Sequence, residues 1–381
     1  MAVERVLPTD VAGELLELTR ELATKEVAPR AAEGEATGRF PRELFRTLGE
    51  AGLLGLPYPE EYGGGGQPYE VYLQVVEELA AAWLTVGLGV SVHTLSCFPI
   101  AEFGSSEQRG SLLPDMIGGE LLGAYCLSEP QSGSDAAALR TRAVRDADGY
   151  VVDGVKAWTT HGGVADFYTL MARTGEEGAR GISCLHLPAD AEGLSFGTPE
   201  RKMGMRSSPT AQVRLDGVRL PPEALIGREG EGFRIAMAAL DGGRLGIAAC
   251  AVGVAQAALD AATSYARERR QFGSRIADFQ GIGFMLADMA TQISAARALY
   301  LEAARLRDAG RPYSAQAAMA KLFASDVCMK VAVDAVQILG GYGYVEDFPV
   351  ERYLREAKVL QIVEGTNQIQ RLVISRSLTR D

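Results

Sequence analysis

The sequence contains few cysteines, and they are not arranged in pairs. The five cysteines lie far apart, and no two of them have CxxC spacing. An odd number of widely separated cysteines predicts neither a disulfide framework nor a zinc site. We expect all five thiols to be reduced and buried: Cys97, Cys126, Cys184, Cys250 and Cys328.

Several familiar nucleotide and hydrolase motifs are also missing. No GxGxxG follows a predicted strand, and no lysine precedes a serine or threonine, which excludes the Rossmann fingerprint and the Walker A loop. The three histidines form no HExxH, so hydrolytic zinc chemistry has no support. GxSxG is absent as well, which removes the usual thioesterase of the α/β-hydrolase type.

Positive charge and long apolar runs are both scarce. The formal net charge is -11, which argues against a nucleic-acid surface because phosphate binding depends on clustered Lys and Arg. The first ten residues, MAVERVLPTD, lack a basic region followed by an apolar core. No uninterrupted apolar run reaches the roughly 18 residues of a membrane span. We expect a cytoplasmic protein that does not enter a membrane.

The pattern of apolar residues and turn signals divides the 381 residues into three parts. With 47% hydrophobic residues the chain can bury a large core and should form two or three domains. Short β-type runs separated by turns, such as GYVVDGVKAWTT, occupy the middle part, and helical spacing dominates on either side. We predict helices over residues 1–122, an antiparallel β-barrel or sandwich over 123–226, and a helical bundle over 227–381.

Local patterns support helices in the first and last parts. In the first part, apolar residues recur at helical spacing in two groups: Leu15, Leu18 and Leu22, and, after Pro41, Leu44, Phe45 and Leu48. Residues 62–68, YGGGGQP, should form a flexible loop, since no strand leads into the glycines and no lysine follows as in a phosphate loop. In the last part, residues 241–267 and 276–309 belong to two long helices, and a third ends at Gly340 and Gly341.

One carboxylate near the C-terminus stands in an apolar run. Glu364 follows VLQIV and precedes Gly365, Thr366 and Asn367, residue types that end and begin helices. Apolar neighbours raise a glutamate pKa above its usual value of about 4.3, because desolvation disfavours the charged form. Such a group suits proton abstraction, although the pattern alone equally allows Glu364 to cap the following helix.

Three other segments contain candidate binding residues, each with a plain structural alternative. The run YCLSEPQSGSD, residues 125–135, offers amides and hydroxyls for the edge of a heterocycle, or is a polar turn. Trp158, at the end of a β run, can fill the core or lie against a flat ring. The arginines of residues 266–280, ARERRQFGSRIADFQ, suit a phosphate site or a solvated helix end.

These segments resemble a known family. Residues 337–376, QILGGYGYVEDFPVERYLREAKVLQIVEGTNQIQRLVISR, resemble the C-terminal signature of the acyl-CoA dehydrogenase family, and the similarity extends over essentially the whole chain in the same order. The resemblance implies an α+β, mainly α fold, in which a middle β-barrel or sandwich separates an N-terminal helical domain from a C-terminal four-helix bundle. It also implies FAD as the cofactor and an acyl-CoA as the substrate, with no metal. In that family the carboxylate of the EGT turn is the base, a role that falls on Glu364.

The resemblance assigns further roles residue by residue. The family motifs TEPxAGSD, WITN, RxxFG and QILGG match segments that contact the flavin. The implied FAD contacts are Tyr125, Cys126, Leu127, Ser128, Ser134, Trp158, Thr159, Thr160, Arg269, Phe272, Gln280, Gln337, Gly340, Gly341, Thr366 and Gln368. The implied substrate contacts are Ser134, Asp241, Arg244, Gly365 and Arg376.

Part of the implied cofactor site comes from another subunit. In the family, the positions of Arg269, Phe272 and Gln280 and the QILGG run reach FAD across an interface, with the arginine on the pyrophosphate. One subunit then cannot complete its own site, so a dimer is the minimum and the homotetramer of the family is expected. An electron-transfer flavoprotein is the implied electron acceptor.

The implied reaction is α,β-dehydrogenation of an acyl-CoA. Glu364 removes the α proton as hydride passes from the β carbon to flavin N5, and the Glu364 backbone amide and a ribityl hydroxyl stabilise the enolate oxygen. Some relatives instead have a glutamate just before the arginine of the DxxR element. Gly243 occupies that position here, which leaves Glu364 as the candidate base.

The departures from the family pattern leave the substrate open. Val363 stands where short- and medium-chain relatives often have Tyr, and His161 replaces the usual Asn but has no assigned catalytic role. The segments LSEP and IAMAALDGGRLGIA most resemble the short-chain branch of the family, which favours a short or branched acyl group. An acyl-CoA oxidase or an acyl-carrier-protein dehydrogenase would share these motifs. A noncatalytic, nucleic-acid-binding relative would show a basic surface, and a flavin monooxygenase of this fold normally lacks the base.

Overall fold

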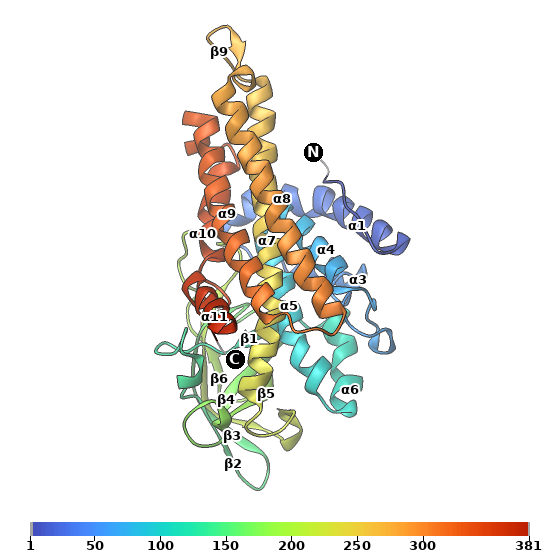
Figure 1. The fold of residues 1–381 in the computed structure, drawn as a ribbon. Coiled ribbons are helices and arrows are strands. Elements are labelled where there is room, and N and C mark those ends of the chain that lie inside the picture. Colours follow the sequence, from blue (N-terminus) through green and yellow to red (C-terminus); the bar gives the residue numbers. More distant parts are fainter. Residues whose placement is uncertain (1–2, 380–381) are drawn as a thin grey trace.

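Two helical regions flank a β domain, in the order that the sequence predicts (Figure 1). The structure, a computed structural model, describes residues 3–379. The long C-terminal helices form a column, the N-terminal helices pack beside its middle, and the sheet lies at one end. The predicted fold class is confirmed.

The N-terminal region contains six α-helices. They are α1 (Asp10–Leu22), α2 (Ala28–Thr37), α3 (Arg42–Glu50), α4 (Tyr69–Ala82), α5 (Leu84–Phe103) and α6 (Ser106–Ile117). Leu44, Phe45 and Leu48 of α3 are buried, as predicted. In α1, however, the buried side chains are Ala12, Leu16 and Thr19, and Leu18 is exposed. Leu15 and Leu22 are partly buried and pack against the core, so the helix predicted from the leucine spacing is confirmed and only Leu18 faces solvent.

Two helices are apolar enough to be compared with membrane spans. By length and composition, α5 and α7 (Gly232–Glu268) could each cross a bilayer, but 94% and 72% of their apolar windows are buried inside the protein. Helices that are apolar all round are also typical of the core of a large protein. The apolar side chains of α5 pack against α4, α7 and the sheet, which accounts for the composition of this helix.

The middle domain is an open, mixed sheet. Its strands are β1 (Gly123–Cys126), β2 (Arg142–Arg145), β3 (Tyr150–Thr160), β4 (Phe167–Arg173), β5 (Ile182–Pro188), β6 (Leu194–Phe196), β7 (Thr210–Leu220) and β8 (Leu225–Ile226). The order is β6-β7-β3-β2-β4-β5-β8, with β1 paired to β4. The sheet agrees with the predicted β domain, but β1 and β2 each pair with β4 in parallel. It does not close into a barrel, since its end strands β6 and β8 are short and do not pair with each other.

The C-terminal region is built around α7. This 37-residue helix packs against α4, α5 and β5, and against α8 (Gln280–Asp308) and α9 (Ser314–Leu339). The hairpin β9 (Arg270–Gln271) and β10 (Ser274–Arg275) forms the tip of the column between α7 and α8. The predicted start of α8 at Ile276 is too early, because residues 276–278 form a separate 3-10 turn.

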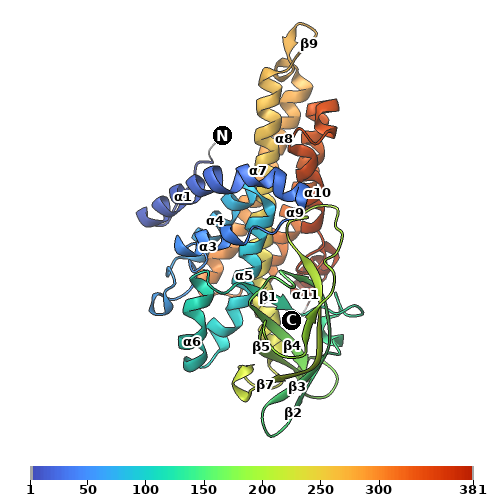
Figure 2. The same ribbon diagram turned by 180° about the vertical axis from the view of Figure 1, so that it is seen from behind.

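Two short helices complete the bundle. α10 (Val350–Leu360) packs on α7 and α9, and α11 (Asn367–Thr379) packs on α9. α9 ends where predicted, with Gly340 in the left-handed region at φ 61°. Figure 2 shows, from behind, α1 running across the column and the sheet lying below α10 beside the lower half of α7. The turn between α10 and α11 is thereby placed next to the sheet.

A buried ion pair joins β3 to the loop after β1. Lys156 Nζ donates to Glu129 Oε1 at 2.8 Å and to the Leu127 carbonyl at 3.1 Å, and both charged side chains are almost completely buried. Glu129 also accepts from the backbone amides of Arg140 and Thr141. Removing one member of such a pair leaves a desolvated charge. The pair therefore holds the loop of residues 125–135 in place.

We predict that Lys156→Met lowers the free energy of unfolding by about 3 to 5 kcal/mol, because Glu129 would remain buried without its counter-charge. Denaturant unfolding followed by tryptophan fluorescence measures the change. The matched control is Arg219→Met, which removes the exposed Arg219–Asp146 pair and should change stability by less than about 1 kcal/mol. Equal effects of the two substitutions would contradict a structural role for the buried pair.

Candidate active site

Glu364 lies on a tight turn between α10 and α11. Both Glu364 and Gly365 adopt left-handed backbone conformations, with φ of 52° and 87°. This conformation is uncommon for a residue with a side chain, and it directs Glu364 back toward α7. Among the described residues, neither carboxylate oxygen has a hydrogen-bond partner, although both oxygens are buried.

The capping alternative for Glu364 is not supported by this geometry. The Thr366 hydroxyl accepts from the backbone amide of Ile369 at 3.3 Å at the start of α11. Thr366 is therefore the residue that caps the helix, and the Glu364 carboxylate is left for another role.

Burial controls the protonation of Glu364. Desolvation raises the pKa of the carboxyl to about 7, and the positive charges of Arg244 and Lys321 act in the opposite direction. A carboxylate with a pKa near the working pH can both take up and release a proton. The arrangement is therefore suited to general base catalysis near neutral pH.

Gly243 provides the space that the carboxylate occupies. A Cβ atom at this position of α7 would lie 2.0 Å from Glu364 Oε2, which is far inside van der Waals contact. The base position that some relatives use, just before Arg244, and the Glu364 carboxylate therefore compete for one volume. A side chain at residue 243 and the observed position of Glu364 exclude each other.

Hydroxyl groups surround the base. Tyr69 and Tyr72 approach it from α4 and Tyr125 approaches from β1, each close enough for the carboxylate to influence its pKa. Tyr69 Oη donates to the Gly242 carbonyl at 3.1 Å, whereas the buried Tyr125 Oη has no protein partner among the described residues. The surroundings of Glu364 thus combine aromatic rings with buried polar atoms that have no partner among the described residues.

The predicted substrate contacts fall into a buried and an exposed group. Arg244 Nη1 and Asp241 Oδ1 form an ion pair of 2.6 Å, and the second Asp241 oxygen accepts from Ser314. Arg244 is buried beside Glu364, and Gly365 lies in the turn itself. Ser134 and Arg376, by contrast, are exposed, so the protein itself does not bring them to the base.

The loop after β1 and the end of β3 lie side by side. Cys126 Sγ and Thr159 Oγ1 are 3.6 Å apart, and the Ser128 carbonyl accepts from the Ala157 amide at 2.9 Å. The β3–β7 register shifts between Lys156 and Thr159. These contacts bring two of the predicted cofactor segments together: Tyr125, Cys126, Leu127 and Ser128 in one, and Trp158, Thr159 and Thr160 in the other.

Trp158 points away from the core. It has a left-handed backbone, φ 61°, at the register shift, and 65% of the residue is exposed. The core-packing alternative for Trp158 is therefore wrong. An indole held outward by an uncommon backbone conformation is suited to lie against a planar ligand.

His161 is a structural residue. Its buried Nδ1 lies 2.9 Å from the Gly123 carbonyl, while the Gly123 amide donates to His93 Nδ1 at 3.0 Å. Burial lowers the pKa of His161 to about 4, so the ring is neutral. Together the two histidines fix the start of β1, which leads into the Tyr125 segment.

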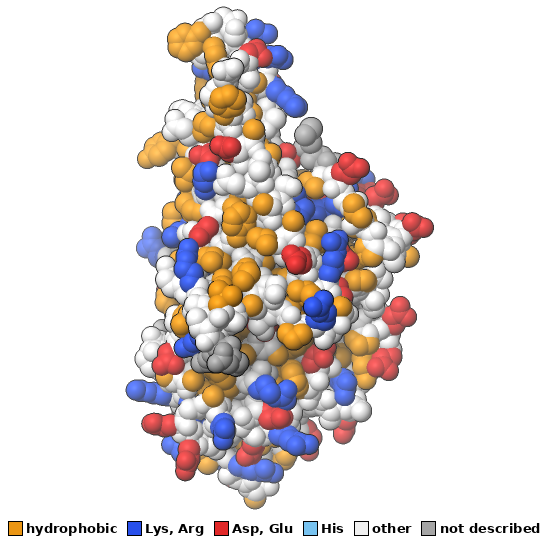
Figure 3. Space-filling model, in the orientation of Figure 1, with side chains coloured by type: hydrophobic (Ala, Val, Ile, Leu, Met, Phe, Trp, Pro, Cys, Tyr) orange, Lys and Arg blue, Asp and Glu red, His pale blue; other side chains and the backbone are white. Residues whose placement is uncertain are grey.

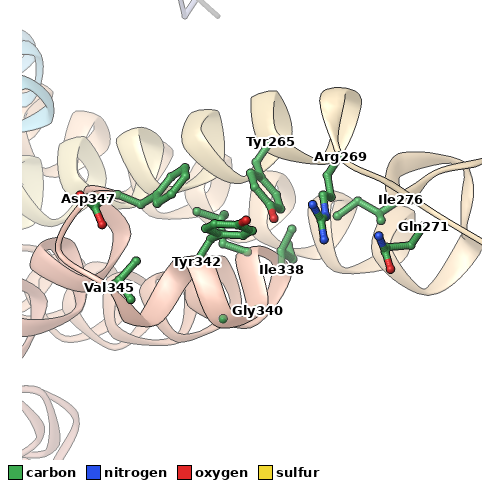
Figure 4. A pocket seen from close by; sticks show the side chains of 12 residues that line it. Tyr265, Arg269, Gln271, Ile276, Ile338, Gly340, Tyr342, Val345 and Asp347 are labelled. Atoms are coloured by element: carbon green, nitrogen blue, oxygen red, sulfur yellow. The ribbon is translucent and has the colours of Figure 1, made fainter.

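A second group of predicted cofactor residues lies at the end of the column far from the sheet (Figure 1). Arg269 and Phe272 flank β9 at this tip, whereas Trp158 belongs to strand β3 of the sheet. A hollow of about 840 Å³ at the tip is lined by Arg269, Gly340 and Gly341, among others, and the Arg269 guanidinium lies 5.6 Å from the Tyr342 ring centroid (Figure 4). Phe272 is 95% exposed, and Gln280, Gln337 and Gln368 are exposed as well.

Comparison with known proteins decides the family. Three family models match consecutive parts of the chain: acyl-CoA dehydrogenase N-terminal domain at residues 9–120, middle domain at 124–218 and C-terminal domain at 230–379. The chain belongs to the acyl-CoA dehydrogenase family. The resemblance seen in the sequence is thus confirmed, together with the enzyme class and the FAD cofactor of the family.

Individual relatives cover almost the whole chain. The short-chain specific acyl-CoA dehydrogenase of Clostridium acetobutylicum is 45% identical over 96% of this chain and 97% of its own. Butyryl-CoA dehydrogenase from Megasphaera elsdenii superposes with a TM-score of 0.96 at 41% identity, over 99% of this chain and 100% of the other. A chain in a solved structure of the electron transferring flavoprotein of Acidaminococcus fermentans gives 0.97 at 46% identity, with both chains fully covered.

The site residues of this acyl-CoA dehydrogenase fit a flavin. Trp158 presents an exposed aromatic face, Tyr125 Oη is buried without a partner, and the loop around Ser128 exposes small polar groups. Among residues 3–379, no group of three or more His, Cys, Asp or Glu side chains is placed to hold a metal ion. All five cysteines are free and buried, as predicted.

Sequence reasoning missed the residues that support the site from behind. Lys156 and Glu129 hold the flavin-side loop, and Lys321 contacts the turn of the base. Lys156 and Lys321 are both completely buried, each with polar partners. A single lysine within an alternating strand, or in the Ala-rich run AAMAKLFA, was the available signal.

We predict that Gly243→Ala lowers the rate of flavin reduction by an acyl-CoA by on the order of 100-fold, because the new methyl group displaces Glu364 from its position. Anaerobic stopped-flow bleaching of the flavin measures the rate. Gly110→Ala in α6 is the matched control, since its Cβ meets nothing within 4 Å. An unchanged rate in Gly243→Ala would show that the carboxylate does not act from the observed position.

Proposed function

We propose that this enzyme catalyses α,β-dehydrogenation of a short or branched acyl-CoA with Glu364 as the base. The observation that carries the proposal is the buried carboxylate of Glu364, which has no hydrogen-bond partner among the described residues and lies against Gly243 of α7. The family membership indicates the reaction class. The position of Glu364 on the EGT turn indicates which residue is the base.

The side chain and the backbone of Glu364 have different roles in proton removal. Glu364 accepts the α proton, and desolvation by the bound thioester would strengthen its interaction with Arg244 and Lys321. The backbone amide of Glu364 donates toward the thioester oxygen, where negative charge develops as the proton leaves. Bound FAD supplies the hydride acceptor, flavin N5.

Cofactor and substrate contacts follow the predicted assignments. Tyr125 to Ser128, Trp158, Thr159 and Thr160 would hold the flavin ring, with Thr366 and Gln368 near the base turn. Asp241 and Arg244 would contact the thioester and pantetheine, with Ser134, Gly365 and Arg376 as further contacts. The adjacency of the first two segments supports the flavin assignments, and the ion pair of Asp241 with Arg244 supports the substrate assignments.

A short or branched acyl chain is favoured by two observations. Tyr69 and Tyr72 fill the space between the base and α4 with large rings, whose centroids are 5.0 Å apart. The relatives named short-chain specific and butyryl-CoA dehydrogenase are 45% and 41% identical to this chain. We propose CoA, rather than an acyl carrier protein, as the carrier.

We further propose that two subunits complete each flavin site and that the enzyme is a homotetramer. Arg269 and the residues around Gly340 lie at the tip of the column, away from Trp158 of the same chain (Figure 1), so a second subunit is required to join the two groups. Hydrophobic side chains follow the outside of the bundle in Figure 3. Exposed large apolar residues occur on α8, α9 and α11: Phe284, Phe323, Val333, Leu372 and Leu378.

The similarity to known acyl-CoA dehydrogenases also supports proposals for the electron acceptor, the location and the metabolic role. The match to a chain in the electron transferring flavoprotein structure supports an electron-transfer flavoprotein as the acceptor. We propose a cytoplasmic location, with residues 1–122, 123–226 and 227–381 as the three domains. Fatty acid β-oxidation is the matching metabolic role.

We predict that Glu364→Gln binds FAD and stays yellow but is not bleached by any member of a panel of acyl-CoAs, because the amide cannot accept the α proton. The wild-type enzyme should bleach fastest with short or branched chains. Anaerobic titration, followed by absorbance, measures both. Bleaching of Glu364→Gln at the wild-type rate would remove Glu364 as the base. Reoxidation of the wild type by oxygen as fast as by the acceptor flavoprotein would instead identify an oxidase.

We predict that activity reappears when two inactive chains are co-expressed, one with Glu364→Gln and the other with Arg269→Glu. If each site combines Glu364 of one subunit with Arg269 of its partner, a mixed dimer has one intact site. Because one of the two sites in each mixed dimer is intact, purified mixed dimers should show about half of the wild-type activity per FAD site. The measured quantity is the specific activity of mixed oligomers purified through two different tags. Absence of activity in those oligomers would mean that both residues serve the same subunit's site.

A further inference from the structure

A single buried lysine contacts the turn that carries the base. Lys321 lies on α9, its side chain is completely buried, and Nζ donates to the Gly365 carbonyl at 3.0 Å and to Asn367 Oδ1 at 2.9 Å. Gly365 and Asn367 are the residues that follow Glu364 and begin α11. Lys321 thus links α9 to Gly365 and Asn367, the first and third residues after Glu364.

Other side chains tie the same turn to α9. Asn367 Nδ2 donates to Ser325 Oγ at 2.9 Å and to Asp326 Oδ1 at 2.7 Å. Gln361, on the other side of Glu364, donates to Asp326 Oδ1 at 2.7 Å. The two carbonyls of Glu364 and Gly365 also accept from Gln370 Nε2, at 3.2 and 2.8 Å. The left-handed backbone at Glu364 is therefore held by hydrogen bonds before and after it.

The turn does not need a positive charge for these contacts. Lys321 bonds only to a carbonyl and an amide oxygen, and it forms no ion pair with a carboxylate of the described residues. A neutral donor could supply the same hydrogen bonds at a lower desolvation cost. Two carboxylates lie within electrostatic reach of Lys321, Glu364 and Asp326 of the same helix, and of these the charge of Glu364 has the larger effect on Lys321.

Every element packed around Glu364 contributes groups to its electrostatic environment. Arg244 and Cys250 face it from α7, Tyr69 and Tyr72 from α4, and Tyr125 from β1. Only Arg244 and Lys321 are cations, and Arg244 is already paired with Asp241. Burial lowers the pKa of Lys321 to about 8, so its ammonium form still predominates at pH 7. Lys321 is therefore the cation near Glu364 that no carboxylate neutralises by direct contact.

We propose that Lys321 is a positioning residue for the catalytic base: its hydrogen bonds hold the turn of Glu364, and its charge keeps the Glu364 carboxylate available near neutral pH. This inference rests on the proposed role of Glu364 in the reaction. Lys321 acts on Glu364 and not on the substrate, because it contacts the turn from α9 through the Gly365 carbonyl.

Three substitutions separate the two contributions. Lys321→Gln retains an amide donor for the Gly365 carbonyl but removes the charge, Lys321→Met removes both, and Lys321→Arg retains both. Lys330→Gln is the matched control, because Lys330 lies exposed on the same helix. Thermal unfolding of each purified holoenzyme verifies that the fold is retained.

We predict that the pH midpoint of anaerobic flavin bleaching, near 7 in the wild type, rises by about one pH unit or more in Lys321→Gln. The base must be ionised to act, so the rate rises with pH through the pKa of Glu364. Loss of a nearby cation moves that pKa upward. Above the midpoint, Lys321→Gln should approach the wild-type rate. Lys321→Met should remain slower by on the order of 100-fold at every pH, because the turn is displaced as well. Lys321→Arg should restore the wild-type midpoint.

A second readout does not depend on turnover. The infrared carbonyl band of the protonated Glu364 carboxyl, assigned by its absence in Glu364→Gln, is titrated in the wild type and in Lys321→Gln. A wild-type midpoint in Lys321→Gln, or an equal shift in Lys330→Gln, would overturn the proposal. If the wild-type enzyme were bleached by no acyl-CoA at any pH, the proposed function would fail instead. The infrared titration would still report whether Lys321 sets the pKa of Glu364.

Discussion

The architecture around the site depends on keeping one carboxylate away from water without giving it a hydrogen-bond partner. Burial of an unpaired carboxyl group is costly, and the protein tolerates it at Glu364 by raising the pKa of the group to about 7. Three features of the surrounding structure allow this arrangement. Gly243 has no side chain to clash with the carboxylate, Thr366 caps α11 in place of Glu364, and α9 holds the turn through hydrogen bonds.

The long helix α7 connects this constraint to the rest of the molecule. One of its faces carries Gly243 and Arg244 at the base, and the same helix continues to the tip, where Arg269 follows its last turn. One continuous helix thus carries Arg244 near Glu364 and leads directly into Arg269 at its far end, the residues proposed for the substrate and for the pyrophosphate. This separation explains why a chain with an intact base turn still requires a second subunit in the proposed enzyme.

The unusual backbone conformations mark the functional surface. The non-glycine residues with positive φ include Trp158, His161, Phe272 and Glu364, which all lie in segments singled out from the sequence. Such conformations are retained where the surrounding structure enforces them. At Trp158 the effect is to expose an indole, at Glu364 to bury a carboxylate, and at His161 to fix the strand that leads into the flavin-side loop.

Much of this protein was predictable from the sequence. Helical spacing, strand texture and the glycines after Leu339 define the order of the elements, because these signals are local. The apolar run around Glu364 already indicates a raised pKa. An error arose where packing partners decide the outcome: the parallel pairing of β1 and β2 depends on β4, which follows them in the chain.

The amino-acid sequence by itself determined which residues can do chemistry and the order of the helical and β regions along the chain. Only the tertiary structure decided that Glu364 lies opposite Gly243, that Lys156 and Lys321 are buried, and that the two groups of cofactor residues are apart. The physical reason is that desolvation and close contact depend on segments that are distant in the chain, 27 residues for Lys156 with Glu129 and 44 for Lys321 with Gly365. Nothing in the local sequence of either segment specifies the other.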